Sequence, residues 1–338
     1  MTATTELDPK LLKAKRNAAN QLLKTDSTGN VLAVGIGERK DPGAKPTKCI
    51  RVYVQSWRPP ADLPPNGINL RASAMLPKTF EGFRMDVVEI GRFGRAGVVL
   101  KQPPQQGPGS PIRLDTAASN VSSRATGTWG AVVQYGAKNH FILSCNHILS
   151  VNGRVPQNTR IVSGAPCGPG KKPLPIATFL GEGYFVEIGT DPNPVDCALA
   201  RLKTKAPPPT NAVKLGSPQP GTTVTKVGAA SGTTHGIIVD THADVSVDYS
   251  FGTFRFNDQI LIKGIVDNGQ QTEFAVDGDS GAIVVDSAGA AIGMVFAEAG
   301  EYAVACPLTK VFRKLGETLN QAPGLKGLRA SLSIVKLA

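Results

Sequence analysis

The second half of the chain is a series of short apolar runs, and this pattern constrains the fold more than any other feature. Turn residues separate nearly all of the runs, which is typical of antiparallel strands in a barrel or sandwich. Glycine (37) and proline (26) are frequent and aromatic residues are only 6% of the 338 residues, which favours many turns over a helical bundle. The sequence therefore predicts a mainly β fold. The predicted strands are Gly130–Gln134, Asn139–Ser144, Val195–Leu202, Thr223–Val227, Gly236–Val239, Gln259–Lys263, Gly281–Val285 and Ala291–Phe296.

The first 100 residues have a different pattern. Apolar residues recur at helical spacing in Pro9–Leu23, with basic residues between them. Three strand-like runs follow, Val31–Gly37, Cys49–Trp57 and Met85–Ile90. We expect a small α+β domain over residues 1–100.

Two segments rich in proline suggest boundaries. Lys101–Arg113 contains too much proline, glycine and glutamine to pack a core, and Ala206–Asn211 interrupts the strand series. A helical pattern follows the last strand. The predicted organisation is an α+β domain (1–100), a linker (101–118), a β domain (119–315) with halves at about 119–208 and 212–307 and a helix at about 308–319, and a tail (316–338).

The chain carries a formal net charge of +11, and much of the excess lies near its two ends. Such a charge permits attraction to nucleic acid, anionic membranes or acidic proteins. Because no basic motif with interleaved aromatic residues accompanies it, solvated helix faces are the better interpretation, which argues against nucleic acid as a partner.

No apolar run is long enough to span a membrane, and residues 1–23 contain no secretory apolar segment. Five widely spaced cysteines are unlike a disulfide framework, so we expect free thiols in a reducing, cytoplasmic setting. Cys145 and His147 form a close pair, but no second pair completes a metal site, so no metal is expected. The cysteines are Cys49, Cys145, Cys167, Cys197 and Cys306.

Three separated residues suggest nucleophilic chemistry. Ser280 lies between glycines in Asp277–Gly281, His147 follows an apolar strand, and Asp196 begins another. A serine hydroxyl becomes a nucleophile when an imidazole removes its proton and a carboxylate orients that imidazole. The glycines beside Ser280 would also let the amides of Gly278 and Ser280 converge on an oxyanion.

Three motifs, Leu143–His147, Val195–Leu199 and Gly278–Gly281, resemble in order and interval those of the chymotrypsin-like (trypsin-like) serine peptidases, over residues 119–315. The resemblance implies two antiparallel six-stranded β-barrels, with the site in the cleft between them. Because Ile148 follows His147 where secreted animal members have cysteine, the intracellular bacterial branch is the better comparison. The α+β block at 1–100 is similar to an extension found on some of those proteins.

The resemblance also assigns roles. It implies that His147, Asp196 and Ser280 form a catalytic triad and that the amides of Gly278 and Ser280 form an oxyanion hole. Asp279 would support the oxyanion loop, either through another partner in the folded chain or after cleavage in the linker 101–118. The residues implied for the substrate pocket are Phe274, Phe296, Ala297 and Glu298, and they leave an apolar and a basic preference both open.

The leading interpretation is an intracellular serine endopeptidase without a cofactor, acting on protein or peptide substrates and not on a membrane. One alternative is a regulated protease of a bacterial defence or signalling cascade, activated by cleavage or by a protein partner at the N-terminal domain. The other is an inactive two-barrel binding module that engages nucleic acid or an acidic protein.

Overall fold

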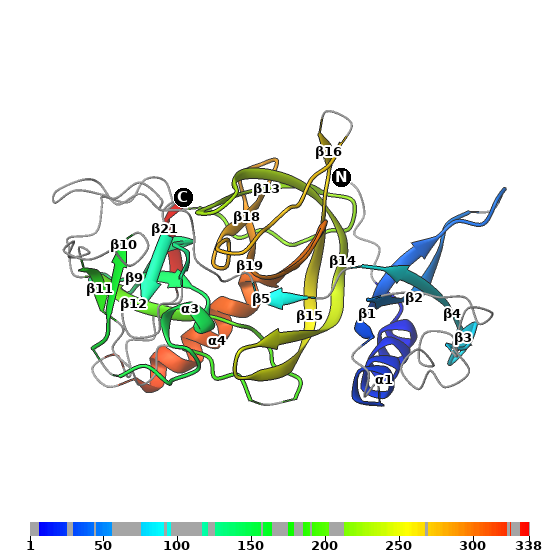
Figure 1. Ribbon diagram of the computed structural model, residues 1–338, viewed down its shortest axis with the longest axis horizontal. Coiled ribbons are helices and arrows are strands. Elements are labelled where there is room, and N and C mark those ends of the chain that lie inside the picture. The colour runs from blue at the N-terminus through cyan, green and yellow to red at the C-terminus, as the bar shows by residue number, and fades with distance from the viewer. Residues whose placement is uncertain are drawn as a thin grey trace.

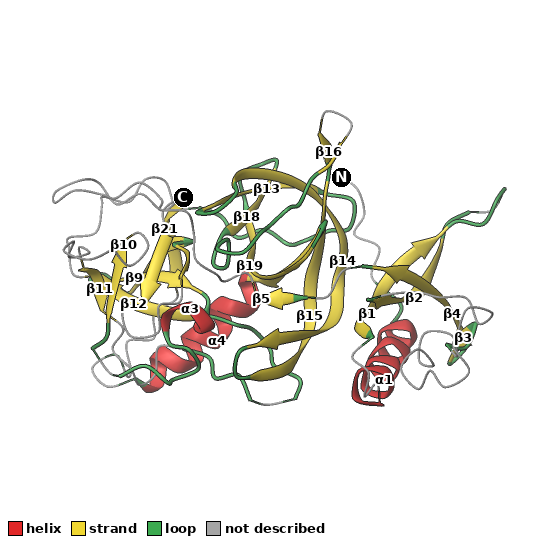
Figure 2. Ribbon diagram, in the orientation of Figure 1, coloured by secondary structure: helices red, strands yellow, loops and turns green. Residues whose placement is uncertain are grey.

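Strands predominate in the computed structural model (Figure 2), which confirms the predicted mainly β class. The predicted linker segment 101–113, the proline run 206–211 and Cys167 lie outside the described residues. The structure describes residues 7–25, 30–43, 45–55, 76–90, 93–95, 117–120, 126–156, 158–163, 175–178, 185–189, 191–202, 213–267, 270–322, 325 and 332–337.

The N-terminal unit is one helix on a small sheet. Helix α1 (Pro9–Thr25) buries Leu11, Ala14 and Ala18, which recur every three or four residues and therefore share one face. This face packs on strands β1 (Val31–Arg39), β2 (Thr47–Val54) and β4 (Phe83–Glu89), and the short β3 (Thr79–Phe80) pairs with β4. The predicted helix and three strands are confirmed, with ends shifted by a few residues.

Six strands of the second half close into an antiparallel barrel. Their order is β13-β18-β19-β20-β15-β14, and β14 pairs back with β13. The interior holds an apolar cluster that includes Phe274. The strands are β13 (Thr223–Gly228), β14 (Gly232–Tyr249), β15 (Gly252–Gly264), β18 (Ile283–Asp286), β19 (Ala291–Ala299) and β20 (Tyr302–Pro307), and a small hairpin adds β16 (Val266–Asp267) and β17 (Gln270–Gln271).

The first half forms a second antiparallel sheet, of eight strands rather than the six expected, in the order β21-β8-β9-β12-β11-β10-β6-β7. One of the additional strands, β21 (Leu332–Leu337), comes from the segment expected to be a tail. The other strands are β6 (Ala117–Asn120), β7 (Thr126–Thr128), β8 (Ala131–Tyr135), β9 (Asn139–Ser144), β10 (Arg160–Ser163), β11 (Pro175–Thr178) and β12 (Ala198–Leu202).

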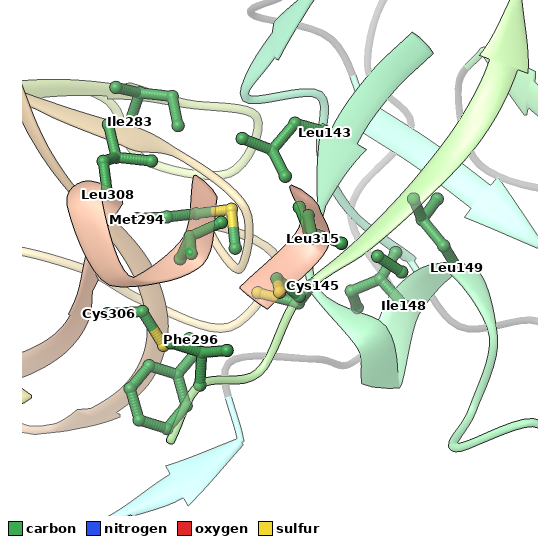
Figure 3. Close-up of a cluster of buried hydrophobic side chains, with 14 of the residues drawn as sticks. Leu143, Cys145, Ile148, Leu149, Ile283, Met294, Phe296, Cys306, Leu308 and Leu315 are labelled. Atoms are coloured by element: carbon green, nitrogen blue, oxygen red, sulfur yellow. The ribbon is translucent and has the colours of Figure 1, made fainter. Parts of the chain in front are cut away.

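One continuous apolar core joins the two sheets. Helix α4 (Leu308–Gln321) buries Leu308, Val311 and Leu315 at helical spacing, and the short α3 (Asn146–Leu149) is buried along its whole length. Figure 3 shows α4 side chains among residues of both halves, including Leu143, Ile148, Met294 and Cys306. The residues that carry the sequence motifs are therefore held by a shared interior.

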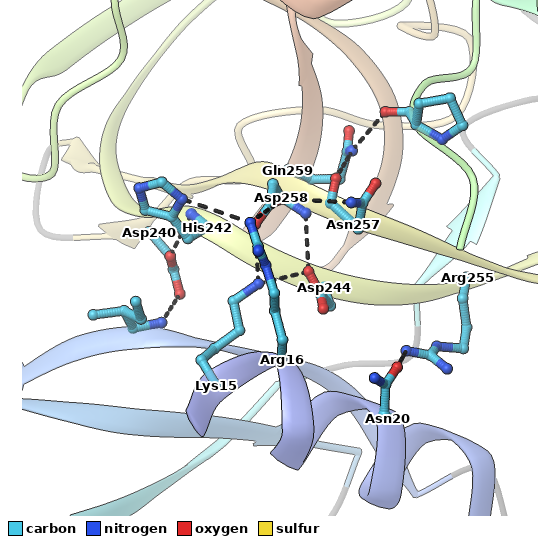
Figure 4. Close-up of polar contacts among 12 residues, drawn as sticks. Lys15, Arg16, Asn20, Asp240, His242, Asp244, Arg255, Asn257, Asp258 and Gln259 are labelled. Carbon is cyan, nitrogen blue, oxygen red and sulfur yellow. Dashed lines mark hydrogen bonds and ion pairs between the residues drawn. The ribbon is translucent and has the colours of Figure 1, made fainter. Parts of the chain in front are cut away.

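The N-terminal unit is joined to the barrel by main-chain pairing and by buried charge. Strand β1 pairs antiparallel with β14, so its small sheet continues into the barrel wall (Figure 1). The buried Nζ of Lys15 lies 2.7 Å from Asp244 and 3.1 Å from Asp258, and Asp240 accepts a 2.8 Å hydrogen bond from the Ile36 amide (Figure 4). The division at residue 100 stays a prediction.

Among the described residues, no helix combines the length and the apolar character that a membrane crossing requires.

Candidate active site

The eight-stranded sheet brings His147 and Asp196 together. Strand β9 ends at Ser144 and leads directly into α3, which carries His147 in its first turn. Strand β12 pairs with β9 at Ala198 and Ser144, so Asp196, two residues before β12, lies beside the helix. Ser280 comes from the other barrel, in the turn before β18.

The three side chains form a continuous hydrogen-bonded row. The Nδ1 atom of His147 lies 2.6 Å from Oδ2 of Asp196, and its Nε2 atom lies 3.0 Å from Oγ of Ser280. His147 is 4% exposed, and Asp196 and Ser280 are fully buried. This is the geometry in which an imidazole can accept a hydroxyl proton while a carboxylate fixes its tautomer.

Asp196 is held by further donors. Its Oδ1 accepts hydrogen bonds from the amides of Asn146 (2.7 Å) and His147 (3.3 Å), and its Oδ2 accepts one from the hydroxyl of Tyr249 (2.8 Å). Hydrogen bonds to an ionised carboxylate stabilise its charged form in a buried position. The carboxylate is therefore fixed from both sides.

Tyr249 is a site residue that the sequence did not reveal. Its ring meets the His147 ring edge-on, with centroids 5.4 Å apart. Burial and the nearby charge of Asp196 raise the pKa of Tyr249 well above its usual value, so the phenol stays protonated and donates. No motif marks this residue, because it ends an 18-residue strand of which only Gly236–Val239 was predicted.

The turn around Ser280 requires glycine at two positions. Gly278 and Gly281 have φ values of 100° and 101°, a region that side chains strongly disfavour. A Cβ at Gly281 would also lie 2.3 Å from the Thr128 carbonyl oxygen. Among the described residues, the amides of Gly278 and Ser280 donate to no protein acceptor, so both donors remain available.

Asp279 has an internal cationic partner, Lys226 of β13. The two side chains are fully buried, and Nζ of Lys226 lies 2.7 Å from Oδ2 of Asp279. Three amides, of Val276, Ala230 and Ser231, and the Ser231 hydroxyl also donate to this carboxylate. Of the two alternatives for Asp279, the structure therefore contains the partner within the folded chain.

Cysteine thiols surround the site as buried, weakly polar groups. Cys145 Sγ donates to the Val295 carbonyl oxygen at 3.2 Å, and Cys306 Sγ accepts from the Asp196 amide at 3.3 Å. Burial raises the pKa of both thiols and of Cys197. Donor atoms of Cys145, His147 and Asp196 lie within 4.8 Å of one another, but a protonated thiol and a paired carboxylate and imidazole fit a metal ion poorly.

The residues expected around a substrate pocket occupy different environments. The Phe296 carbonyl oxygen lies 3.5 Å from Ser280 Oγ, and Ala297 and Glu298 follow it along β19. Burial, followed by the charge of Asp277, raises the pKa of Glu298 to about 7. Phe274 is fully buried in the interior cluster of the second barrel.

No family model matches the sequence, and no curated protein shows a significant match to it. Solved structures are similar at low identity. Thermobifida fusca protease A is 15% identical with a TM-score of 0.40, and the match covers 61% of this chain and 97% of that one. A glutamic-acid-specific serine protease is 12% identical with a TM-score of 0.41, covering 66% and 100%. Nocardiopsis protease is 11% identical with a TM-score of 0.40, covering 65% and 96%.

Proposed function

We propose that this chain is a serine endopeptidase that hydrolyses peptide bonds through Ser280, His147 and Asp196. The observation that carries the proposal is the position of the His147 ring, with one nitrogen 2.6 Å from a carboxylate and the other 3.0 Å from a hydroxyl. Because that hydroxyl belongs to a separate barrel, only the folded chain assembles the row. The Gly278 and Ser280 amides are the proposed oxyanion donors.

In the first half-reaction, Ser280 Oγ attacks the scissile carbonyl carbon and His147 Nε2 takes the hydroxyl proton. The carbonyl oxygen becomes an oxyanion, which the Gly278 and Ser280 amides stabilise. Collapse of the tetrahedral intermediate breaks the C–N bond, and His147 delivers its proton to the departing amine. The product that remains is an ester between Ser280 and the acyl half of the substrate.

In the second half-reaction, His147 removes a proton from water, which attacks the ester, and Ser280 regains the proton when the ester bond breaks. Asp196 stays ionised throughout and stabilises the imidazolium. The Tyr249 hydroxyl and the Asn146 and His147 amides fix this carboxylate, so it does not have to reorganise when the imidazole becomes charged.

The substrate is a protein or peptide, and the proposed pocket residues stay Phe274, Phe296, Ala297 and Glu298. An apolar and a basic side chain before the cleaved bond remain the two alternatives, since Phe296 is apolar and Glu298 carries a carboxyl. Mass spectrometry of cleavage sites in a denatured proteome digest would separate them. We place the enzyme in the cytoplasm, because the four cysteines within the described residues, Cys49, Cys145, Cys197 and Cys306, are free thiols.

A fluorophosphonate probe tests the catalytic assignment, because it phosphonylates a serine only where a base activates it. The wild-type protein should be labelled on Ser280, and Ser280→Ala should not be labelled. Ser287→Ala, an exposed serine seven residues further along, is the matched control and should be labelled like wild type. A folded wild-type protein that resists the probe and cleaves no member of a peptide library would overturn the assignment.

A further inference from the structure

A two-residue strand from the N-terminal region lies against the proposed active site. Strand β5 (Gly94–Arg95) pairs with strands of the barrel and not with β1–β4, which precede it in sequence; its antiparallel partner is β19 (Figure 1). The paired residues are Arg95 with Ala297 and Gly94 with Glu298. On its other side, Gly94 pairs parallel with Asp248 of β14, next to Tyr249.

The edge of β19 that β5 covers is the one beside the nucleophile. Strand β20 occupies the opposite edge and pairs with Ala297 and Glu298. On the β5 side, β18 pairs with β19 as far as Met294, and the Ser280 turn follows, with Gly281 N donating to Val295 O. The next residue, Phe296, has its carbonyl oxygen 3.5 Å from Ser280 Oγ. Ala297 and Glu298 are therefore the first edge positions beyond the hydroxyl.

The direction of β5 matches that of a peptide approaching Ser280. Residue numbers rise along β5 from Glu298 toward Ala297, and so toward the hydroxyl. An extended peptide that adds to this edge as an antiparallel strand would place its carboxyl side nearest the nucleophile in the same way. Strand β5 therefore runs in the same chain direction as a bound peptide substrate would.

The packing around β5 holds the segment in place. Phe93, immediately before it, is 1% exposed in the main apolar core, and the Ile90 amide donates to the Val54 carbonyl oxygen at 2.8 Å. Ser280 itself is fully buried. A segment tethered in this way competes with a free peptide at an effective concentration on the order of millimolar.

We infer that β5 is an autoinhibitory strand, which occupies in the substrate direction the main-chain binding edge that peptides need. The inference rests on the proposed function and adds its regulation. A peptide substrate must displace Gly94 and Arg95 from β19 before it can add there, so turnover of peptides is restrained while the catalytic row is already assembled.

The experiment compares two double variants. Gly94→Pro with Arg95→Pro removes both amide donors, whichever of them faces β19, whereas Gly94→Ala with Arg95→Ala keeps them. Fluorophosphonate labelling counts the competent molecules in each sample. The proline variant should hydrolyse an unstructured peptide with kcat/KM raised about tenfold or more over wild type, the size expected for a few main-chain hydrogen bonds, and the alanine variant should stay near wild type.

A second measurement guards against loss of folding in the proline variant. A synthetic peptide of residues 90–97 should inhibit hydrolysis competitively, and the same residues in reverse order should not. If both double variants melt like wild type, label equally and hydrolyse at the wild-type rate, the autoinhibitory strand is excluded while the peptidase assignment stands. If none of the proteins labels or hydrolyses, the peptidase assignment fails first.

Discussion

Replacing Lys226 by methionine tests whether a buried ion pair maintains the loop that carries the proposed oxyanion donors. Methionine has an unbranched side chain of similar length and carries no charge. Asp279 then loses the Nζ contact at 2.7 Å, while it sits between Gly278 and Ser280, whose amides are the proposed donors. We expect a loss of both stability and turnover.

The expected size follows from the surroundings of the pair. Both side chains are fully buried, and removing one partner of such a pair costs about 3–5 kcal/mol. Asp279 keeps four donors, the Ser231 hydroxyl and the amides of Val276, Ala230 and Ser231, which favours a loss of about 3 kcal/mol. A displaced oxyanion amide typically lowers kcat about 100-fold or more.

Urea unfolding and kcat measured on probe-titrated enzyme give the two quantities. Lys214→Met, at an exposed lysine, is the matched control, and its free energy of unfolding should stay within about 0.5 kcal/mol of the wild-type value. Combining Lys226→Met with Asp279→Asn should regain part of the stability, because no unpaired charge is then buried.

The expectation would be wrong if the free energy of unfolding of Lys226→Met lay within about 1 kcal/mol of the wild-type value and its kcat were unchanged. That result would mean that the remaining donors to Asp279 hold the loop without the lysine.

Two further changes test groups beside the proposed catalytic residues. Tyr249→Phe removes the hydroxyl that donates to Asp196. Because a hydrogen bond to a charged group contributes about 1.5–3 kcal/mol, this change should lower kcat about tenfold with little change in KM. An unchanged kcat in steady-state kinetics would refute the proposed role of Tyr249. The pKa of Glu298, about 7, lies above its ordinary 4.5, so folding favours the protonated form and stability falls as pH rises from about 4.5 to 7. The free energy of unfolding of Glu298→Gln should therefore exceed that of wild type at pH 8, by roughly 1 kcal/mol after allowing for partial exposure, and should be nearly equal to it at pH 4. Thermal or urea unfolding at the two pH values measures this, and a stability difference of the same size at both would contradict the raised pKa of Glu298.

Local sequence patterns predicted the helices and strands whose own residues show a clear periodicity. Strand β9 has the predicted bounds, Asn139–Ser144, and the opening helix begins at Pro9 as expected, because alternation and helical spacing are visible in short windows. Strand β20 was missed, since Tyr302–Pro307 is a nearly fully buried run without alternation. The pairing of β1 with β14 joins residues about 210 apart, which no local pattern encodes.

In the candidate site, too, the sequence identified some residues and not others. Motif spacing identified the three residues that the structure brings together, because each lies in a short, recognisable run. The sequence did not single out Lys226, since an isolated lysine in a strand is usually solvated, and its acidic partner is 53 residues away. Strand β5 has two residues, too few for any periodic signal.

The sheet that runs from β4 through β1 into β14 also bears on how such a protein can be divided or recombined. A chimera that takes only the half with the proposed active site would have to be cut through a hydrogen-bonded ladder, and Asp244 would be left without the ammonium of Lys15. Shuffling between related genes should therefore preserve residues 9–54 together with the barrel, and an exposed sheet edge would make the isolated half prone to aggregate.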